Sequence, residues 1–280
     1  MNYKIELISF FSDYLLEILI SIIIVFIVIS LTLFLLTLIK RALRIRKTSL
    51  KARYQKIVDR AIFNYLFSSE EINPGEVNIF NFDFAKNTLF KKVAIKSIVS
   101  LHHSYSGEYQ EKLESFYVKS KLVNYSIKKL DSKKWYHKIE AIRDLSSLNY
   151  QQAFGDIKRY FSHKNELVQS ETLIAVLKLK GIDELLDQDH LKLYLNDWTQ
   201  SNILFTVKSN KINDTGSLNK LLESENVSFQ LLGVRLINHY NNVNYLNNLK
   251  EFLLKTTDLK LRAETENAID SITGNYKHII

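Results

Sequence analysis

The sequence predicts an all-α protein in which one transmembrane helix is followed by a domain of many short helices. Residues 18–39 form an uncharged and almost wholly apolar run. Gly and Pro number only 7 and 1 in 280 residues, fewer turn residues than a large β-rich domain needs. Beyond the run, apolar residues recur at three- and four-residue spacing, the period of an amphipathic helix. The chain has no cysteine, which excludes disulfides and thiolate metal sites and is consistent with a cytosolic domain.

The transmembrane helix is predicted over residues 15–39, after a short extracytoplasmic N-terminus of residues 1–14. A helix rises about 1.5 Å per residue, so the 22 uncharged residues 18–39 cross a hydrocarbon core of roughly 30 Å. A buried core helix explains this run poorly, because the run is apolar on every face. A cleaved signal peptide is also disfavoured, because the run is too long, its N-terminal flank is acidic and no small-residue cleavage site follows.

Basic residues are concentrated directly after this run. Residues 40–60 contain nine Lys or Arg and one acid, Asp59, and so carry +8, the net charge of the whole chain; the remainder has 29 basic and 29 acidic residues. Basic flanks are retained in the cytoplasm, which predicts an outside N-terminus and a cytoplasmic C-terminal domain. The residues assigned to this role are Lys40, Arg41, Arg44, Arg46, Lys47, Lys51 and Arg53. They could serve topology alone or also attract anionic lipid, and the neutral remainder argues against nucleic acid as a partner.

A basic, amphipathic juxtamembrane helix is predicted over residues 40–67. Its apolar face is made by Leu50, Tyr54, Ile57, Val58, Ala61, Ile62, Tyr65 and Leu66. This face could lie on the bilayer or pack on the first helices of the next domain. Residues 68–82 hold the only Pro-Gly pair and are predicted to be a linker.

Residues 83–275 are predicted to form a helical repeat domain. The candidate helices are 83–104, 107–129, 132–148, 150–162, 166–180, 182–196, 199–209, 216–224, 228–240, 242–255 and 258–273. Cap-type residues precede several of them, such as Asn226 and Asp258. Similar segments recur at 34 residues, pairing Val227 with Leu261, Val234 with Ala268 and Ala141 with Ala175. A period of about 30–45 residues with two helices per unit is typical of an α-solenoid.

The segment from Asp258 to Gly274 resembles one helix of a HEAT repeat. Its acidic start, hydrophobe-Arg pair, small residue and closing Gly carry the resemblance, and residues 134–148 and 165–181 are similar. The resemblance covers about 130–275 and implies a HEAT-like, armadillo-like α-solenoid of antiparallel helix pairs. The sequence departs from the HEAT pattern in two ways. The proline common in the first HEAT helix is absent, and residues 182–215 fit no full unit.

The resemblance implies protein binding rather than catalysis. A solenoid offers an extended, ordered surface without one closed pocket, and HEAT-like arrays mostly act as scaffolds. We therefore expect a membrane-anchored cytoplasmic scaffold that binds a partner protein, in a bacterial inner membrane. A more specific version of this hypothesis is an accessory subunit of an envelope or polysaccharide assembly. No residue of the sequence identifies that particular partner. The alternatives are an adaptor that binds lipid or nucleic acid through the basic segments, and a HEAT-like enzyme.

No catalytic, cofactor-binding or metal-binding residue is predicted. The sequence lacks the His-Glu-x-x-His zinc pattern, the Gly-x-x-x-x-Gly-Lys phosphate loop and the Gly-x-Ser-x-Gly elbow. Asp214-Thr215-Gly216 spells the aspartic-protease triplet, but that chemistry needs two carboxylates and the triplet occurs once, so a cap or turn explains it. His102 and His103 are adjacent and point apart on a helix, which makes a poor metal pair.

One lysine-rich stretch is kept as a candidate partner-binding region. Residues 117–138 have Asp131 as their only acid. The candidate residues are Lys119, Lys121, Lys128, Lys129, Lys133 and Lys134. Solvated helix edges explain them most simply, and an acidic or lipid partner is the alternative. Trp135, at the start of a predicted helix, is expected to pack in the core.

Overall fold

The computed structural model describes residues 2–67, 87–186 and 193–277, and these residues form helices and turns without a strand. The all-α prediction is therefore confirmed for this part of the chain. The predicted linker, residues 68–82, lies outside the described residues. The chain divides into two units, residues 1–58 and residues 59–280, and each is described by itself.

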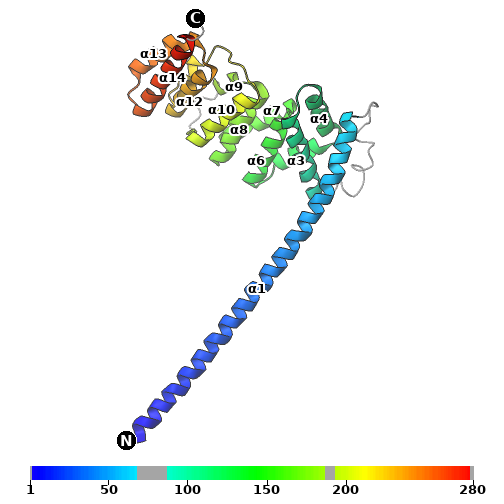
Figure 1. Ribbon diagram of the computed structural model, residues 1–280, viewed down its shortest axis with the longest axis vertical. Helices are drawn as coiled ribbons and strands as arrows, with labels where there is room; N and C mark the ends of the chain where they lie inside the picture. Colours follow the sequence, from blue (N-terminus) through cyan, green and yellow to red (C-terminus); the bar gives the residue numbers. More distant parts are fainter. Residues whose placement is uncertain (1, 68–86, 187–192, 278–280) are drawn as a thin grey trace. The chain divides into compact units, whose positions relative to one another are not determined.

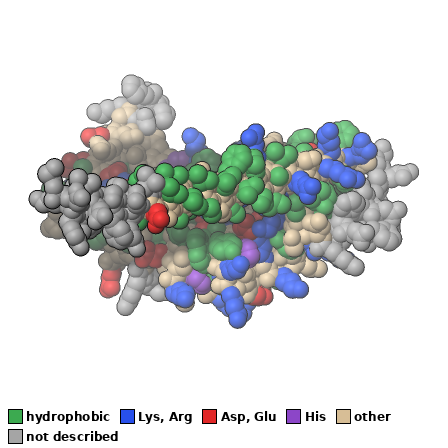
Figure 2. Space-filling model, turned by 90° about the horizontal axis from the view of Figure 1, so that it is seen from below, with side chains coloured by type: hydrophobic (Ala, Val, Ile, Leu, Met, Phe, Trp, Pro, Cys, Tyr) green, Lys and Arg blue, Asp and Glu red, His purple; other side chains and the backbone are tan. Residues whose placement is uncertain are grey.

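Helix α1 (Asn2–Phe67) is one uninterrupted helix (Figure 1). Every side chain from Glu17 to Arg53 is exposed, including all the apolar side chains of residues 18–39. Figure 2 shows these hydrophobic side chains as a continuous band, with Lys and Arg gathered toward one end. Three hydroxyls in the run are hydrogen-bonded within the helix, because Ser21, Thr32 and Thr37 each donate to the carbonyl four residues earlier at 2.8 Å. By length and composition, α1 can cross a membrane.

The last turns of α1 belong to the second unit and pack into it. Ala61, Ile62 and Leu66 are buried. The Tyr65 hydroxyl donates to Ser115 Oγ at 3.2 Å, and the Tyr65 ring lies 5.1 Å from the ring of Phe116. Of the two alternatives for the amphipathic helix, packing on the following domain is thus the one observed for this end.

The second unit continues with short helices. They are α3 (Thr88–Ser104), α4 (Glu108–Lys119), α5 (Leu122–Leu130), α6 (Trp135–Ser147), η1 (Gln151–Ala153), α7 (Phe154–Lys158), η2 (Arg159–Ser162), α8 (Glu166–Lys180), α9 (Asp183–Leu186), α10 (Asp197–Ser209), α11 (Asn219–Leu222), α12 (Val227–Tyr240), η3 (Val243–Tyr245), α13 (Leu246–Lys255) and α14 (Leu259–Lys277). Asparagine is the N-cap of four of these α-helices. The side chains of Asn87, Asn165, Asn196 and Asn226 accept a bond from the first turn of α3, α8, α10 and α12, which satisfies otherwise unpaired backbone donors.

Five helices, α6, α8, α10, α12 and α14, follow one another through this unit, and each packs on the next (Figure 1). They begin 31, 31, 30 and 32 residues apart, and shorter helical segments lie between them in the sequence. Residues that match at a spacing of 34 in the sequence therefore do not occupy equivalent positions in successive helices. Val227 is half-exposed whereas Leu261 is buried, although Ala141 and Ala175 are both buried.

Several predicted helices differ from those observed. The helix predicted over 107–129 is two helices, because Lys121 has a φ of 59° and the chain turns there. Of the helix predicted over 182–196, α9 is observed and residues 193–196 are not helical, while residues 187–192 lie outside the described residues. Residues 216–224 contain only α11, and residues 150–162 form α7 between two 3₁₀ turns. Gly181 does end α8, with a φ of 89°, but Gly274 lies inside α14 and closes nothing.

Candidate binding groove on helices α3, α6, α8 and α10

A groove of about 490 Å³ lies over α6, α8 and α10, beside the C-terminal end of α3. Aromatic side chains of α10 form one wall, and charged side chains of α6 and α8 form the other. His103 of α3 closes one side. We refer to this feature as the groove.

The aromatic wall consists of Trp198 and Phe205, which are 58% and 69% exposed. They lie seven residues apart with Asn202 between them, so all three occupy one face of α10. The opposite face of α10 is buried through Ile203 and Val207, which fixes the direction of the exposed one. Large aromatic side chains left together in solvent are typical of a binding surface.

The charged wall contains a neutralised pair. The Arg143 guanidinium donates two hydrogen bonds to the Glu171 carboxylate, one of them from Nε to Oε2 at 2.7 Å. Glu171 is buried, and the bond to it raises the pKa of Arg143, which stays charged. The pair ties α6 to α8 and leaves no net charge on this part of the wall.

Lys178 supplies a charge that this wall does not neutralise. Its ammonium donates to Ser147 Oγ at 3.3 Å, and no acid of the described residues lies within ion-pair distance of it. Burial lowers the pKa of Lys178, the neighbouring Glu171 raises it, and Arg143 lowers it further. Burial, Lys178 and His102 together lower the pKa of His103, so His103 is neutral at neutral pH. The groove therefore combines one half-buried cation with two exposed aromatic rings.

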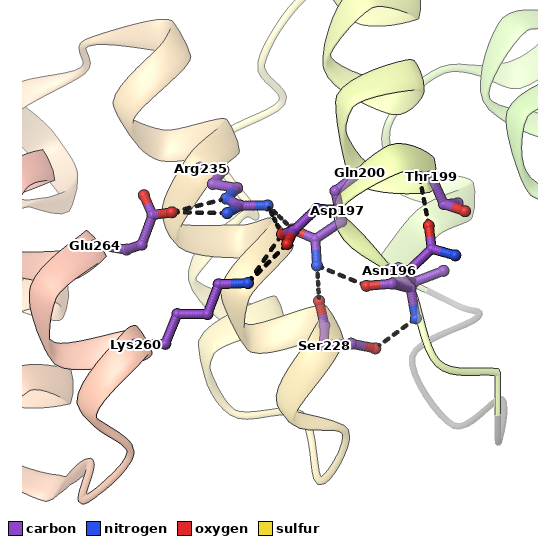
Figure 3. A network of polar contacts seen from close by, with 9 residues as sticks. Asn196, Asp197, Thr199, Gln200, Ser228, Arg235, Lys260 and Glu264 are labelled. Carbon is purple, nitrogen blue, oxygen red and sulfur yellow. Dashed lines mark hydrogen bonds and ion pairs between the residues drawn. The ribbon is translucent and has the colours of Figure 1, made fainter.

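The start of α10 is held by a polar network that joins it to α12 and α14 (Figure 3). Arg235 donates to Glu264 at 2.7 and 3.2 Å, to Asp197 at 2.9 Å and to Gln200 at 3.0 Å. Lys260 also binds Asp197, at 3.0 Å. This network fixes the helix that carries the aromatic wall.

A second set of contacts anchors the same end of α10. The buried Gln200 side chain donates to the carbonyls of Leu195 and Ser228, at 2.9 and 3.2 Å, and Ser228 Oγ accepts from Leu195 N at 2.9 Å. These bonds satisfy the backbone just before α10 (Figure 3). The position of Trp198 is thus set by two polar networks on the other side of its helix.

The candidate lysines fall into separate groups rather than one surface. Lys119 ends α4 and Lys121 precedes α5, about 13 Å of helix from the end of α5, near which Lys128, Lys133 and Lys134 are exposed. Lys129 is buried and binds Glu140 at 2.8 Å and Asp144 at 3.3 Å, so its charge is already matched.

Three further sequence predictions can be placed. The expectation that Trp135 packs in the core is wrong, because the ring is 43% exposed. Asp214 serves a turn, accepting from Gly216 N at 2.9 Å and from the Tyr245 hydroxyl at 2.8 Å. His102 is buried at 2.9 Å from Glu114, whereas His103 lines the groove, so the two histidines have different surroundings.

The basic residues assigned to the membrane flank are all exposed on α1, from Lys40 to Arg53. Within the residues that the structure describes, no three His, Asp or Glu side chains are grouped as metal ligands. No known protein family matches the sequence. A comparison with curated proteins likewise finds none that is similar.

Sequence reasoning missed the groove residues Arg143, Lys178, Trp198 and Phe205. A partial signal was present, because Trp198 and Phe205 are seven residues apart in a helix in which two other apolar residues, Ile203 and Val207, mark the opposite face. The neighbouring charges could not be found in this way, since they come from two other helices.

Proposed function

We propose that the protein is a membrane-anchored scaffold that binds a partner protein through the groove. The observation that carries the proposal is the exposure of Trp198 and Phe205 beside the half-buried Lys178. Exposed Trp side chains with a cation nearby have the composition of binding hot spots. More than half of each of the two aromatic side chains is exposed, which suits a protein segment better than a small substrate, whose pocket would bury it.

We further propose that the second unit is a HEAT-like α-solenoid of antiparallel helix pairs. Its support is the 30- to 32-residue interval between the five helices that pack in sequence. Arg143 with Glu171, and Arg235 with Glu264, join successive helices of this series by similar ion pairs. Such repetition is expected when each unit buries its apolar side only against its neighbours.

The anchor is proposed to be α1, with its N-terminus outside and the second unit in the cytoplasm of a bacterial cell. The exposed apolar run and the exposed basic flank support this orientation. Replacing Lys40, Arg41, Arg44, Arg46 and Lys47 by Gln should give mixed orientations. Protease protection of a C-terminal tag in right-side-out and inverted vesicles measures this, and unchanged protection would contradict the orientation.

The chemistry of the groove defines the partner segment. Lys178 needs an acceptor, and a carboxylate is the group that matches a half-buried ammonium best. Trp198 and Phe205 can cover apolar side chains on either side of that carboxylate. We therefore propose that the partner presents an acidic residue flanked by apolar residues, in an assembly of the bacterial envelope.

The proposal is tested by placing a photo-crosslinking amino acid at Asn202, in the groove, and at Lys250, an exposed residue of α13, as the control. Cross-linking in the native cells, followed by peptide mapping, should identify a segment captured only from Asn202. That segment should contain an acidic residue between apolar ones. Equal capture from both positions would contradict the groove as the binding site.

The affinity of the mapped segment for variants of the full-length protein then separates the contributions of the aromatic wall and the charged wall. W198A should weaken binding about 30-fold, the cost of an aromatic hot spot, and K178Q about tenfold or more. K180Q removes an exposed lysine from the same helix and is the matched control, with affinity unchanged. If K178Q and K180Q behave alike, the carboxylate is not recognised by Lys178.

A further inference from the structure

The turn between α5 and α6 exposes aromatic and basic side chains together. Trp135 and Tyr136 are 43% and 44% exposed, their rings 5.9 Å apart, and Lys134 Nζ lies 5.9 Å from the centre of the Tyr136 ring. Lys128 and Lys133 are also exposed. We refer to Lys128, Lys133, Lys134, Trp135 and Tyr136 as the α5–α6 patch.

The charge of this patch is positive and is not matched by neighbouring acids. Three exposed lysines stand against one exposed acid, Asp131, and none of the three forms an ion pair that involves a described residue. Nearby, Lys129 is matched by Glu140 and Asp144, and Lys138 is turned to the carbonyl of Leu130. The lysines of the patch are therefore available to an external anion.

We infer that the α5–α6 patch binds the anionic surface of the bilayer that α1 crosses. This inference rests on the membrane anchor of the proposed function, because anchoring confines the patch to the vicinity of one membrane. Lysines near such a surface are attracted by anionic headgroups. Tryptophan and tyrosine are the side chains that prefer the headgroup region, where the ring is shielded and its polar atom stays wet.

The composition favours lipid over an acidic protein. Flexible, exposed lysines recognise diffuse negative charge without fixed geometry, whereas bidentate recognition of a carboxylate at a surface favours the planar fork of arginine. The patch has no arginine. It is also separate from the groove, whose cation and aromatic rings belong to α8 and α10. Contact between the α5–α6 patch and the bilayer, in addition to the α1 anchor, would limit the orientations that the second unit can take at the membrane.

The inference can be tested with the protein's own fluorescence, because the chain has only two tryptophans. W198F leaves Trp135 as the reporter of the patch, and W135F leaves Trp198 as the matched reporter away from it. The full-length variants are placed in nanodiscs of phosphatidylcholine, with or without phosphatidylglycerol, that carry a nitroxide on the lipid headgroup. Fluorescence quenching by that lipid reports contact with the surface.

Trp135 should be quenched strongly in the discs with phosphatidylglycerol and weakly in neutral discs, and added salt should remove most of the difference. K128Q/K133Q/K134Q should abolish the difference. K208Q/K220Q/K250Q, which removes three exposed lysines elsewhere, should preserve it. Trp198 should show no dependence on lipid charge. Circular dichroism confirms that the variants retain their helices.

Two failures are distinguishable. If the chain is incorporated into the discs but Trp135 is equally quenched with and without phosphatidylglycerol, the patch does not bind anionic lipid and the anchored scaffold still stands. The same conclusion follows if Trp135 and Trp198 respond alike. If the chain does not co-purify with the discs at all, the membrane anchor fails and the inference fails with it.

Discussion

Replacing Arg235 by Gln is expected to destabilise the second unit strongly, because one side chain joins three helices. Arg235 makes four hydrogen bonds, to Glu264, Asp197 and Gln200, and only 18% of its side chain is exposed (Figure 3). Lys260 still neutralises Asp197 in the variant, but Glu264, 32% exposed, loses its partner. Loss of a partly buried ion pair in which two guanidinium nitrogens donate to one carboxylate oxygen costs about 2–3 kcal/mol. For a domain of this size, the melting temperature should fall by about 5–10 °C.

The matched control is Arg159 to Gln, which removes an arginine from an exposed ion pair with Asp156, the two side chains being 72% and 49% exposed. Such pairs contribute little, so the loss should stay within about 0.5 kcal/mol. Both variants are compared with the wild type by thermal unfolding in mild detergent, followed by circular dichroism. A small effect of R235Q, equal to that of R159Q, would refute the view that this network holds α10 to its neighbours.

Three other predictions concern single positions and use urea unfolding in the same detergent. G233A should lower the unfolding free energy by about 1 kcal/mol or more, because a new Cβ would lie 2.8 Å from Leu221 Cβ. This crowding exceeds the gain in helix propensity that alanine brings. A more stable variant would show that α11 shifts to make room. Y117F should leave stability unchanged or raise it by about 1 kcal/mol, because the buried Tyr117 hydroxyl has no hydrogen-bond partner in the described structure; a clear loss would reveal a partner such as an ordered water. Burial raises the pKa of Asp144 to about 6 against the opposing effect of Lys129, so the folded state binds this proton more tightly and the contribution of Asp144 to stability falls as pH rises from about 4 to 6. D144N should remove this pH-dependent contribution, which is up to about 3 kcal/mol. If the stability of D144N changes between pH 4.5 and 7.5 as much as that of the wild type, the shift is contradicted.

The local features of the chain follow from residue order. The uncharged run and its basic flank lie within one continuous helix, whose sides are all exposed as the apolar composition requires. The caps at Asn226 and Asp258 are observed, since a polar side chain before a helix needs only its own first turn for a partner. The break at Lys121 was missed, because no glycine or proline marks that left-handed residue.

Helix content, the apolar span and the positive flank were determined by the sequence alone, since each depends on residues within one or two turns of each other. Tertiary structure alone decided which charges remain unmatched and which rings remain in solvent. Lys129 and Lys128 are neighbours in one lysine-rich stretch, yet α6 supplies acids for the first and none for the second. Trp135 was expected in the core but is exposed, as is Trp198, because burial depends on which helix packs over a side chain. The groove and the α5–α6 patch exist only where separate helices meet.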